Sequence, residues 1–173
     1  MPQAAFADGL LQTWPAGLGG APSDPDAIAW YYENGIPSGG HIKAAPVPGA
    51  VALCTDALRM YGTMSFETVV QPALRLLETG EKDWYPLLAA TLGKLVEAEK
   101  SASGSREEGI QAAYDRFYRG DIADDLEAWY IEGGSFHRKV DLDLHTTRIR
   151  NAADALAELG IPDDGLSTRL AET

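Results

Sequence analysis

"IQAAYDRFYRGDIADDLEAWYIEGG", residues 110–134, is the stretch that decides the fold class of this chain. Its first half has apolar side chains three and four residues apart, the spacing of one face of an α-helix. These side chains are Ile110, Ala113, Tyr114 and Phe117. After Gly120 the spacing recurs and ends at Gly133-Gly134; its members are Ile122, Leu126 and Trp129. Two successive helices separated by a glycine indicate a helical protein.

Upstream of this stretch, similar patterns predict four more helices. They are expected at residues 25–34, 49–61, 65–80 and 83–100. The predicted N-terminal caps are Ser23 or Asp24 followed by Pro25, then Ser65, then Asp83. The predicted stops are Asn34-Gly35, Gly62 and Gly80. Residues 101–109, "SASGSREEG", are polar and glycine-containing, which favours a flexible loop after the fourth of these helices.

Apolar stripes in these helices predict which side chains are buried. The stripes consist of Val51, Cys54, Leu58 and Tyr61, and of Trp84, Leu88, Leu92 and Leu95. Cys54 is interpreted as a small buried residue and not as a nucleophile, because no basic residue or histidine lies near it in the sequence. In the helix over 65–80, Pro72 should produce a kink, and Met64 should pack on Val69.

The C-terminal part gives one strand signal and one more helix. Residues 135–140, "SFHRKV", favour a strand. The last helical pattern consists of Leu142, Ile149, Ala153 and Leu156, with a stop at Gly160 and Pro162. The prediction is therefore a mainly α fold of about six or seven helices with glycine-terminated turns. Its divisions are an irregular N-terminal arm over 1–24, a helical domain over 25–160 and a C-terminal tail over 161–173.

Composition excludes several classes of partner. The 173 residues include 14 Lys and Arg against 26 Asp and Glu, for a formal charge of −12, which disfavours binding to nucleic acid and to anionic membranes. No apolar run is long enough for a membrane span, and the N-terminus lacks a signal-peptide pattern. A cytoplasmic location is the expectation. Cys54 is the one cysteine, so no internal disulfide is expected.

Few residues are arranged for chemistry. Nucleophile-elbow, phosphate-loop, dinucleotide and zinc-helix motifs are absent. The best metal candidate is "DLDLH", with Asp141, Asp143 and His145, but two ligands one turn apart do not make a site, and conventional capping of a helix by Asp141 accounts for the stretch. His41 and His137 lie near glycines and are expected at the surface, and the acid pairs are expected to be solvated; these pairs are Glu107-Glu108 and Asp124-Asp125. We therefore assign no catalytic residue, no cofactor-binding residue, no metal ligand and no cofactor.

Two stretches resemble the large subunit of gamma-glutamyltransferases. The first, residues 44–80, resembles its V-P-G turn, Y-G-x-x-x-F and P-A-x-x-L-A-x-x-G segments through Val47, Pro48, Gly49, Tyr61, Gly62, Phe66, Pro72, Ala73, Leu76 and Gly80. The second, residues 112–142, resembles its F-Y-x-G-x-I-A and G-G-x-x-T-x-x-D-L segments through Phe117, Tyr118, Gly120, Ile122, Ala123, Gly133, Gly134, Asp141 and Leu142. The chain departs from the pattern with Leu77 in place of Ala, with His137 in place of Thr, and with a longer run before Asp141.

The resemblance implies an N-terminal nucleophile hydrolase with an αββα parent fold. Members cut themselves to free a threonine, which transfers a gamma-glutamyl group from glutathione-like donors to water or an amino acceptor. We do not assign that nucleophile to Thr146 or Thr147, because "HTTR" has His145 before the threonines and too little sequence after them. The family's substrate-binding arginine motif is also absent, and its role is given to neither Arg59 nor Lys43.

Two functional hypotheses follow. The chain is either the helical part of a gamma-glutamyltransferase-like large subunit, inactive alone, or a stand-alone helical interaction or scaffold protein. The expected partners are the remainder of such a protein or a second copy of the chain. In either case Gly39-Gly40 and the turn over 46–49 are expected only to redirect the chain into the next helix.

Overall fold

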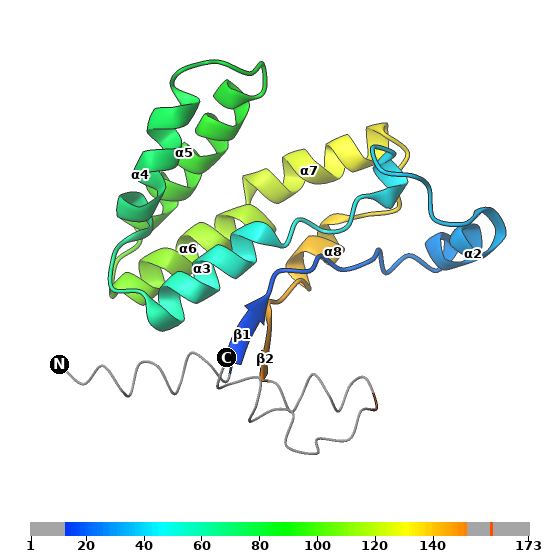
Figure 1. Cartoon of the computed structure of the whole chain (residues 1–173), viewed down its shortest axis with the longest axis horizontal. Coiled ribbons are helices and arrows are strands. Elements are labelled where there is room, and N and C mark those ends of the chain that lie inside the picture. Colours follow the sequence, from blue (N-terminus) through cyan, green and yellow to red (C-terminus); the bar gives the residue numbers. More distant parts are fainter. Residues whose placement is uncertain (1–12, 152–159, 161–173) are drawn as a thin grey trace. The chain divides into compact units, whose positions relative to one another are not determined.

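The computed structural model describes residues 13–151 and Gly160. The chain divides into two compact units, one made of Met1–Gly17 with Thr147–Thr173 and the other of Leu18–Thr146. In the first unit, β1 (Thr13–Ala16) pairs with β2 (Arg148–Asn151) as an antiparallel ladder in which Trp14 lies opposite Arg150 (Figure 1). The second unit contains every helix that the structure describes, which confirms the predicted mainly helical architecture.

The helical unit consists of short helices joined by tight turns. They are α2 (Pro25–Asn34), the 3-10 helix η1 (Ile42–Ala44), α3 (Ala50–Tyr61), α4 (Phe66–Leu77), α5 (Tyr85–Ser101), α6 (Arg106–Tyr118), α7 (Asp121–Glu132) and α8 (Lys139–Asp143). Helix α6 is the centre, since it packs against α3, α5, α7 and α8, while α4 packs on α5 (Figure 1). The stretch whose spacing predicts two successive helices thus supplies the helix that the others surround.

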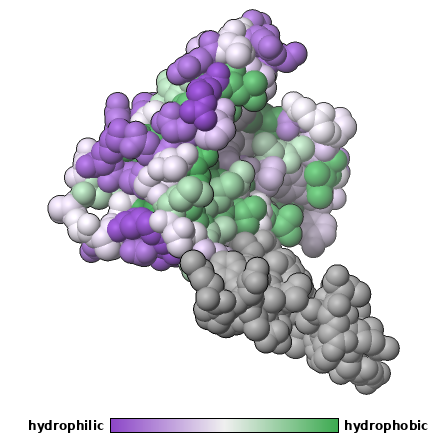
Figure 2. Space-filling model, turned by 60° about the vertical axis from the view of Figure 1, so that its left-hand side comes forward, coloured by the Kyte–Doolittle hydropathy of each residue, from purple (hydrophilic) through white to green (hydrophobic). Residues whose placement is uncertain are grey.

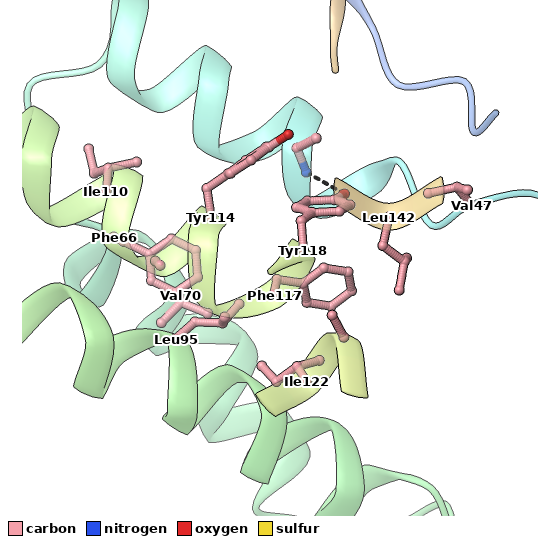
Figure 3. Close-up of a cluster of buried hydrophobic side chains, with 13 residues drawn as sticks. Val47, Phe66, Val70, Leu95, Ile110, Tyr114, Phe117, Tyr118, Ile122 and Leu142 are labelled. Atoms are coloured by element: carbon pink, nitrogen blue, oxygen red, sulfur yellow. Dashed lines mark hydrogen bonds between the residues drawn. The ribbon is translucent and has the colours of Figure 1, made fainter. Parts of the chain in front are cut away.

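The core contains every apolar residue that the sequence marks on α6. Ile110, Ala113, Tyr114 and Phe117 are all buried, and Tyr118 completes the face. Figure 3 shows Tyr118, Leu142 and Val47 on one side of this cluster, and Phe66, Val70 and Leu95 on the other. The whole cluster draws on six helices, α3 to α8, and on the turn before α3, so burial of the α6 face holds the unit together.

Several predicted helix ends are confirmed. The Asp24 carboxylate caps α2 by accepting from the Asp26 amide at 2.9 Å, and Pro25 follows it. The Ser65 hydroxyl caps α4 by accepting from the Thr68 amide at 3.2 Å. Residues of these types at these places satisfy amides that the first helical turn leaves without a partner.

Side chains of other helices also satisfy backbone groups, at the start of α4 and at the end of α3. The Glu99 carboxylate of α5 accepts from the Phe66 amide at 2.6 Å and from the Glu67 amide at 2.7 Å. The Arg106 guanidinium donates to three carbonyls at and beyond the end of α3; these are Leu58 O, Arg59 O and Met64 O, each at 3.1 Å. Charged groups of α5 and α6 therefore lie where the dipoles of α4 and α3 favour them, between helix ends that are distant in sequence.

Replacing Glu99 with glutamine is expected to destabilise the helical unit by about 1 kcal/mol, because one of the two cap acceptors becomes a donor. The measurement is the free energy of unfolding in urea, followed by far-ultraviolet circular dichroism. Glu81→Gln is the matched control, since Glu81 is exposed in the turn between α4 and α5. Equal stability of the two variants would contradict the role given to the Glu99 carboxylate.

The predicted buried stripes are correct only in part, because Val51, Leu58, Leu92 and Leu126 pack partly buried against the core while other members are exposed. Cys54 is exposed, and the buried residues of α3 are Ala52 and Thr55. In α5, Leu95 is buried, but Trp84 and Leu88 are exposed. In α7, Trp129 is exposed and Tyr130 is buried. Apolar spacing marks a face, but the packing of α6 against these helices selects which edge of that face is covered.

Five predictions differ, in whole or in part, from the structure. The predicted loop over 101–109 is shorter in the structure, where only residues 102–105 lie between α5 and α6, and Ser105 forms a capping box with Glu108 at the start of α6. Residues 135–140 form no strand and lead into α8. The predicted last helix is replaced by α8 and β2, and its remaining residues, Ala153 and Leu156, lie outside the described residues. Helix α5 begins at Tyr85 without an Asp83 cap, and the expected irregular arm contains β1.

Candidate functional site

The segments 44–80 and 112–142 meet at the hydroxyl of Tyr118. This hydroxyl donates to Pro48 O at 2.5 Å, across 70 residues of sequence, and accepts from the Ala52 amide at 3.0 Å. The dashed line in Figure 3 marks the second of these bonds. We call Pro48, Ala52 and Tyr118 the tyrosine junction. It joins the turn before α3 to the end of α6.

The junction exists because α3 lacks a side-chain cap of its own. Its N-cap is Gly49, which has no side chain to accept from the first-turn amides. The Tyr118 hydroxyl acts as the missing cap acceptor, because it accepts from the Ala52 amide. Burial raises the pKa of Tyr118 strongly, so the group remains a neutral phenol that can donate to Pro48 O.

A buried histidine packs against the same tyrosine. The His145 ring stacks on the Tyr118 ring with centroids 5.4 Å apart, and the Tyr114 hydroxyl donates to His145 O at 2.5 Å. The His145 Nε2 atom is buried and has no hydrogen-bond partner. Burial lowers the pKa of His145, against a smaller opposing effect of the Asp56 carboxylate. The ring is therefore held neutral, as part of the packing around α6.

A second cluster lies around Asp141 at the start of α8. The Asp141 carboxylate accepts from the Ser23 amide and from the Arg138 amide, both at 2.8 Å. Burial raises the pKa of Asp141, but the bonds from Ser23 and Arg138 outweigh burial, and the net pKa is lowered. The residue was expected as a helix cap; it lies inside α8, where its side chain bonds back to the amide of the N-cap Arg138. It also ties the segment before α2 to the segment before α8.

Ser135, His137 and Asp141 are residue types of a catalytic triad, but their geometry differs from that of a triad. His137 Nδ1 lies 3.2 Å from Ser135 Oγ, and His137 Nε2 lies 3.5 Å from Gly20 O. In a triad the second imidazole nitrogen bonds to the carboxylate, whereas here it faces a backbone carbonyl. Ser135 and His137 are only 4% and 1% exposed, so a substrate has no access to the serine. The cluster therefore has a structural part: it connects the segment before α2 with the segment before α8 and with α8 itself.

The other predicted candidates lie apart from one another. His41 is exposed and caps η1 through Nδ1, as a surface histidine should, whereas His137 is buried, contrary to expectation. Asp143 pairs with Arg119, away from the contacts of Asp141. Thr146 is exposed, and Thr147 directly precedes β2. In the first acid pair, Glu107 forms an ion pair with Arg106, and Glu108 accepts from the Ser105 amide in the capping box of α6. In the second, Asp124 forms an ion pair with Lys139, and Asp125 forms one with Lys94.

Two glycines at the ends of α3 and α6 are required by close backbone contacts. A Cβ atom at Gly62 would lie 2.6 Å from Leu58 O, and one at Gly120 would lie 2.8 Å from Arg116 O. These distances are shorter than real Cβ contacts allow, so another residue would displace the backbone of α3 or α6. The packing of the turns therefore explains both glycines without a ligand.

Stability should fall as the pH drops below about 6.5, the ordinary pKa of histidine. Burial lowers the pKa of both His137 and His145, so below that pH the unfolded chain binds protons more readily than the folded chain. Nearby charges are Asp141 and Arg138 for His137, and Asp56 for His145. The measurement is urea unfolding at pH 7.5 and 5.5. His145→Phe should reduce the difference in the free energy of unfolding between the two pH values, and His41→Gln should leave it unchanged. An unchanged difference in His145→Phe would show that protonation of buried His145 does not destabilise the folded chain.

The residues that the structure describes contain no cluster of three or more His, Cys, Asp or Glu side chains placed to hold a metal ion. Over the same part of the chain, no helix combines the length and apolarity needed to cross a bilayer. No protein-family model and no curated protein matches the chain. What is proposed about function therefore rests on the contacts of Tyr118 and of Asp141.

Proposed function

We propose that this chain is a helical part of a gamma-glutamyltransferase-like large subunit, which supplies structure to an assembly whose nucleophile lies elsewhere. The tyrosine junction is the observation that carries the proposal. The residues that resemble the family in two separate stretches make direct contact through Tyr118 and Pro48. Val47, Phe66, Phe117, Ile122, Ala123 and Leu142, which belong to the same motifs, share one core. Motifs that depend on one another in packing are more informative than either alone.

The strands that flank the helical unit support the same proposal. β1 ends just before this unit and β2 begins just after it, and the two strands pair antiparallel. The helices are thus an excursion between neighbouring strands. An isolated two-stranded ladder has little stability in water, so the pair is well suited to extension by further strands. Such strands belong to the αββα fold that the resemblance implies.

On this proposal, the chemistry is gamma-glutamyl transfer from a glutathione-like donor to water or an amino acceptor. The threonine nucleophile and the donor-binding arginine come from the remainder of the protein. The residues of this chain hold the turn before α3 and the start of α8 in place through Tyr118 and Asp141. We also propose that the protein is cytoplasmic. Cell fractionation measures this, and the protein should be found in the cytoplasmic fraction.

The test is the intact mass of the native polypeptide from its source cells, with the reading frame followed past Thr173. The expected result is a longer precursor that cleaves itself before a downstream threonine and then releases p-nitroaniline from gamma-glutamyl-p-nitroanilide. Replacing that threonine with alanine should abolish both events. A native polypeptide that ends at Thr173 would overturn the proposal.

The second candidate is a stand-alone interaction or scaffold protein, favoured by apolar side chains left exposed on the helical unit. Figure 2 shows apolar surface beside strongly hydrophilic surface on one face of the molecule. On α4 and α5 the exposed apolar side chains include Val69, Leu76, Leu87 and Leu88. Exposed apolar patches often mark interaction sites. A purified chain that ends at Thr173 and forms a defined oligomer in sedimentation would favour this candidate over the first.

A further inference from the structure

The ammonium group of Lys43 lies against two aromatic rings. Its Nζ atom is 4.2 Å from the ring centroid of Trp30 and 4.3 Å from that of Phe136. The three residues come from η1, from α2 and from the segment after α7. Among the described residues, no ion pair of Lys43 is found, so these ring faces are what the structure offers to its positive charge.

A third ring holds this arrangement in place. The Tyr31 ring centroid is 5.5 Å from that of Trp30 and 5.9 Å from that of Phe136, and both contacts are edge-on. The Tyr31 hydroxyl also donates to Lys43 O at 2.6 Å. The His41 ring accepts from the Lys43 amide at 3.1 Å. Rings and backbone are therefore fixed together before any external ligand arrives, which lowers the entropy cost of binding.

The contacts suit a cation that has no hydrogen-bond donors. Ring faces attract positive charge through their quadrupole and need no N–H group, and a tryptophan face is the best of them. Lys43 Nζ has no hydrogen bond among those of the described residues, so its ring contacts would persist for a methylated nitrogen. All three rings and Lys43 are partly exposed, and the net charge of −12 attracts cations from solution.

We propose that Trp30 and Phe136, held in place by Tyr31, form a binding site for a quaternary alkylammonium group, which Lys43 occupies in this structure. Lys43 is then an internal competitor, and a ligand binds when the lysine side chain moves out. This site is separate from the tyrosine junction, and the inference does not depend on the function proposed above.

The test is titration of the full chain with tetramethylammonium chloride, followed by the indole N–H nuclear magnetic resonance signals at constant ionic strength. Lys43→Ala and Lys43→Gln should each bind at least tenfold more tightly than the unaltered chain. The double variant Lys43→Ala/Phe136→Ala should lose this gain. Lys82→Ala is the matched control, because Lys82 is exposed in the turn before α5, and it should bind like the unaltered chain.

A neutral compound of the same shape, 3,3-dimethylbutan-1-ol, separates charge from hydrophobic contact when it is compared with choline. Choline should bind to Lys43→Ala, and the neutral alcohol should bind at least tenfold more weakly. Circular dichroism establishes that each variant is folded. Equal affinity in the unaltered chain and both Lys43 variants, or an undiminished affinity without Phe136, would overturn the proposal.

Discussion

Leu142→Ala is expected to lower the free energy of unfolding of the helical unit by about 2 to 5 kcal/mol, the range for truncating a fully buried leucine. Leu142 is 0% exposed and belongs to the central core cluster. Helix α8 has only five residues, so it cannot be stable without tertiary contacts. Removing the side chain therefore leaves a cavity and also weakens the attachment of α8.

The matched control is Leu144→Ala. Leu144 lies two residues along the chain at the end of α8 and is 67% exposed. The same chemical change there should alter stability by less than about 0.5 kcal/mol, as is usual for surface positions. Urea unfolding followed by circular dichroism measures both variants. A loss in Leu144→Ala as large as that in Leu142→Ala would contradict the burial described for α8.

Tyr118→Phe is expected to cost about 1 to 3 kcal/mol, although it removes a single oxygen atom. That oxygen bonds to both Pro48 O and the Ala52 amide. Ala52 is fully buried, so without the hydroxyl its N–H loses its partner away from water. Since Gly49 has no side chain, no local group of the N-cap replaces the lost acceptor.

Tyr32→Phe provides the comparison, because Tyr32 is 89% exposed on α2. Its stability should remain close to that of the unaltered chain. Amide hydrogen exchange gives a second measurement: protection of the first turn of α3 should fall in Tyr118→Phe and not in Tyr32→Phe. Unchanged protection in Tyr118→Phe would mean that the tyrosine junction does not cap α3.

Local signals in the sequence predicted the helices well where side chains act on their own backbone. Asp24 and Ser65 cap the helices that they precede in the sequence. In α6, four buried residues were marked by spacing alone. Both kinds of signal act within one or two turns of the chain, so neighbouring residues are sufficient to specify them.

The contacts of the candidate site could not be predicted in this way. The missing cap at Gly49 can be read from the sequence, but nothing local identifies Tyr118 as the group that replaces it. Glu99 likewise gives no sign that it caps α4 from another helix. His137 and Asp141 were assigned a surface position and a local cap, and the segment before α2 makes both of them part of a buried tie.

The sequence by itself determined that this is a helical protein and where most of its helices begin and end. These properties depend on the spacing of side chains and on caps within a few residues. Only the tertiary structure decided that Cys54 is exposed, that Tyr118 joins the turn before α3 to α6, and that Lys43 lies against Trp30 and Phe136. Such contacts join residues distant in sequence, and packing selects them after the helices have been specified.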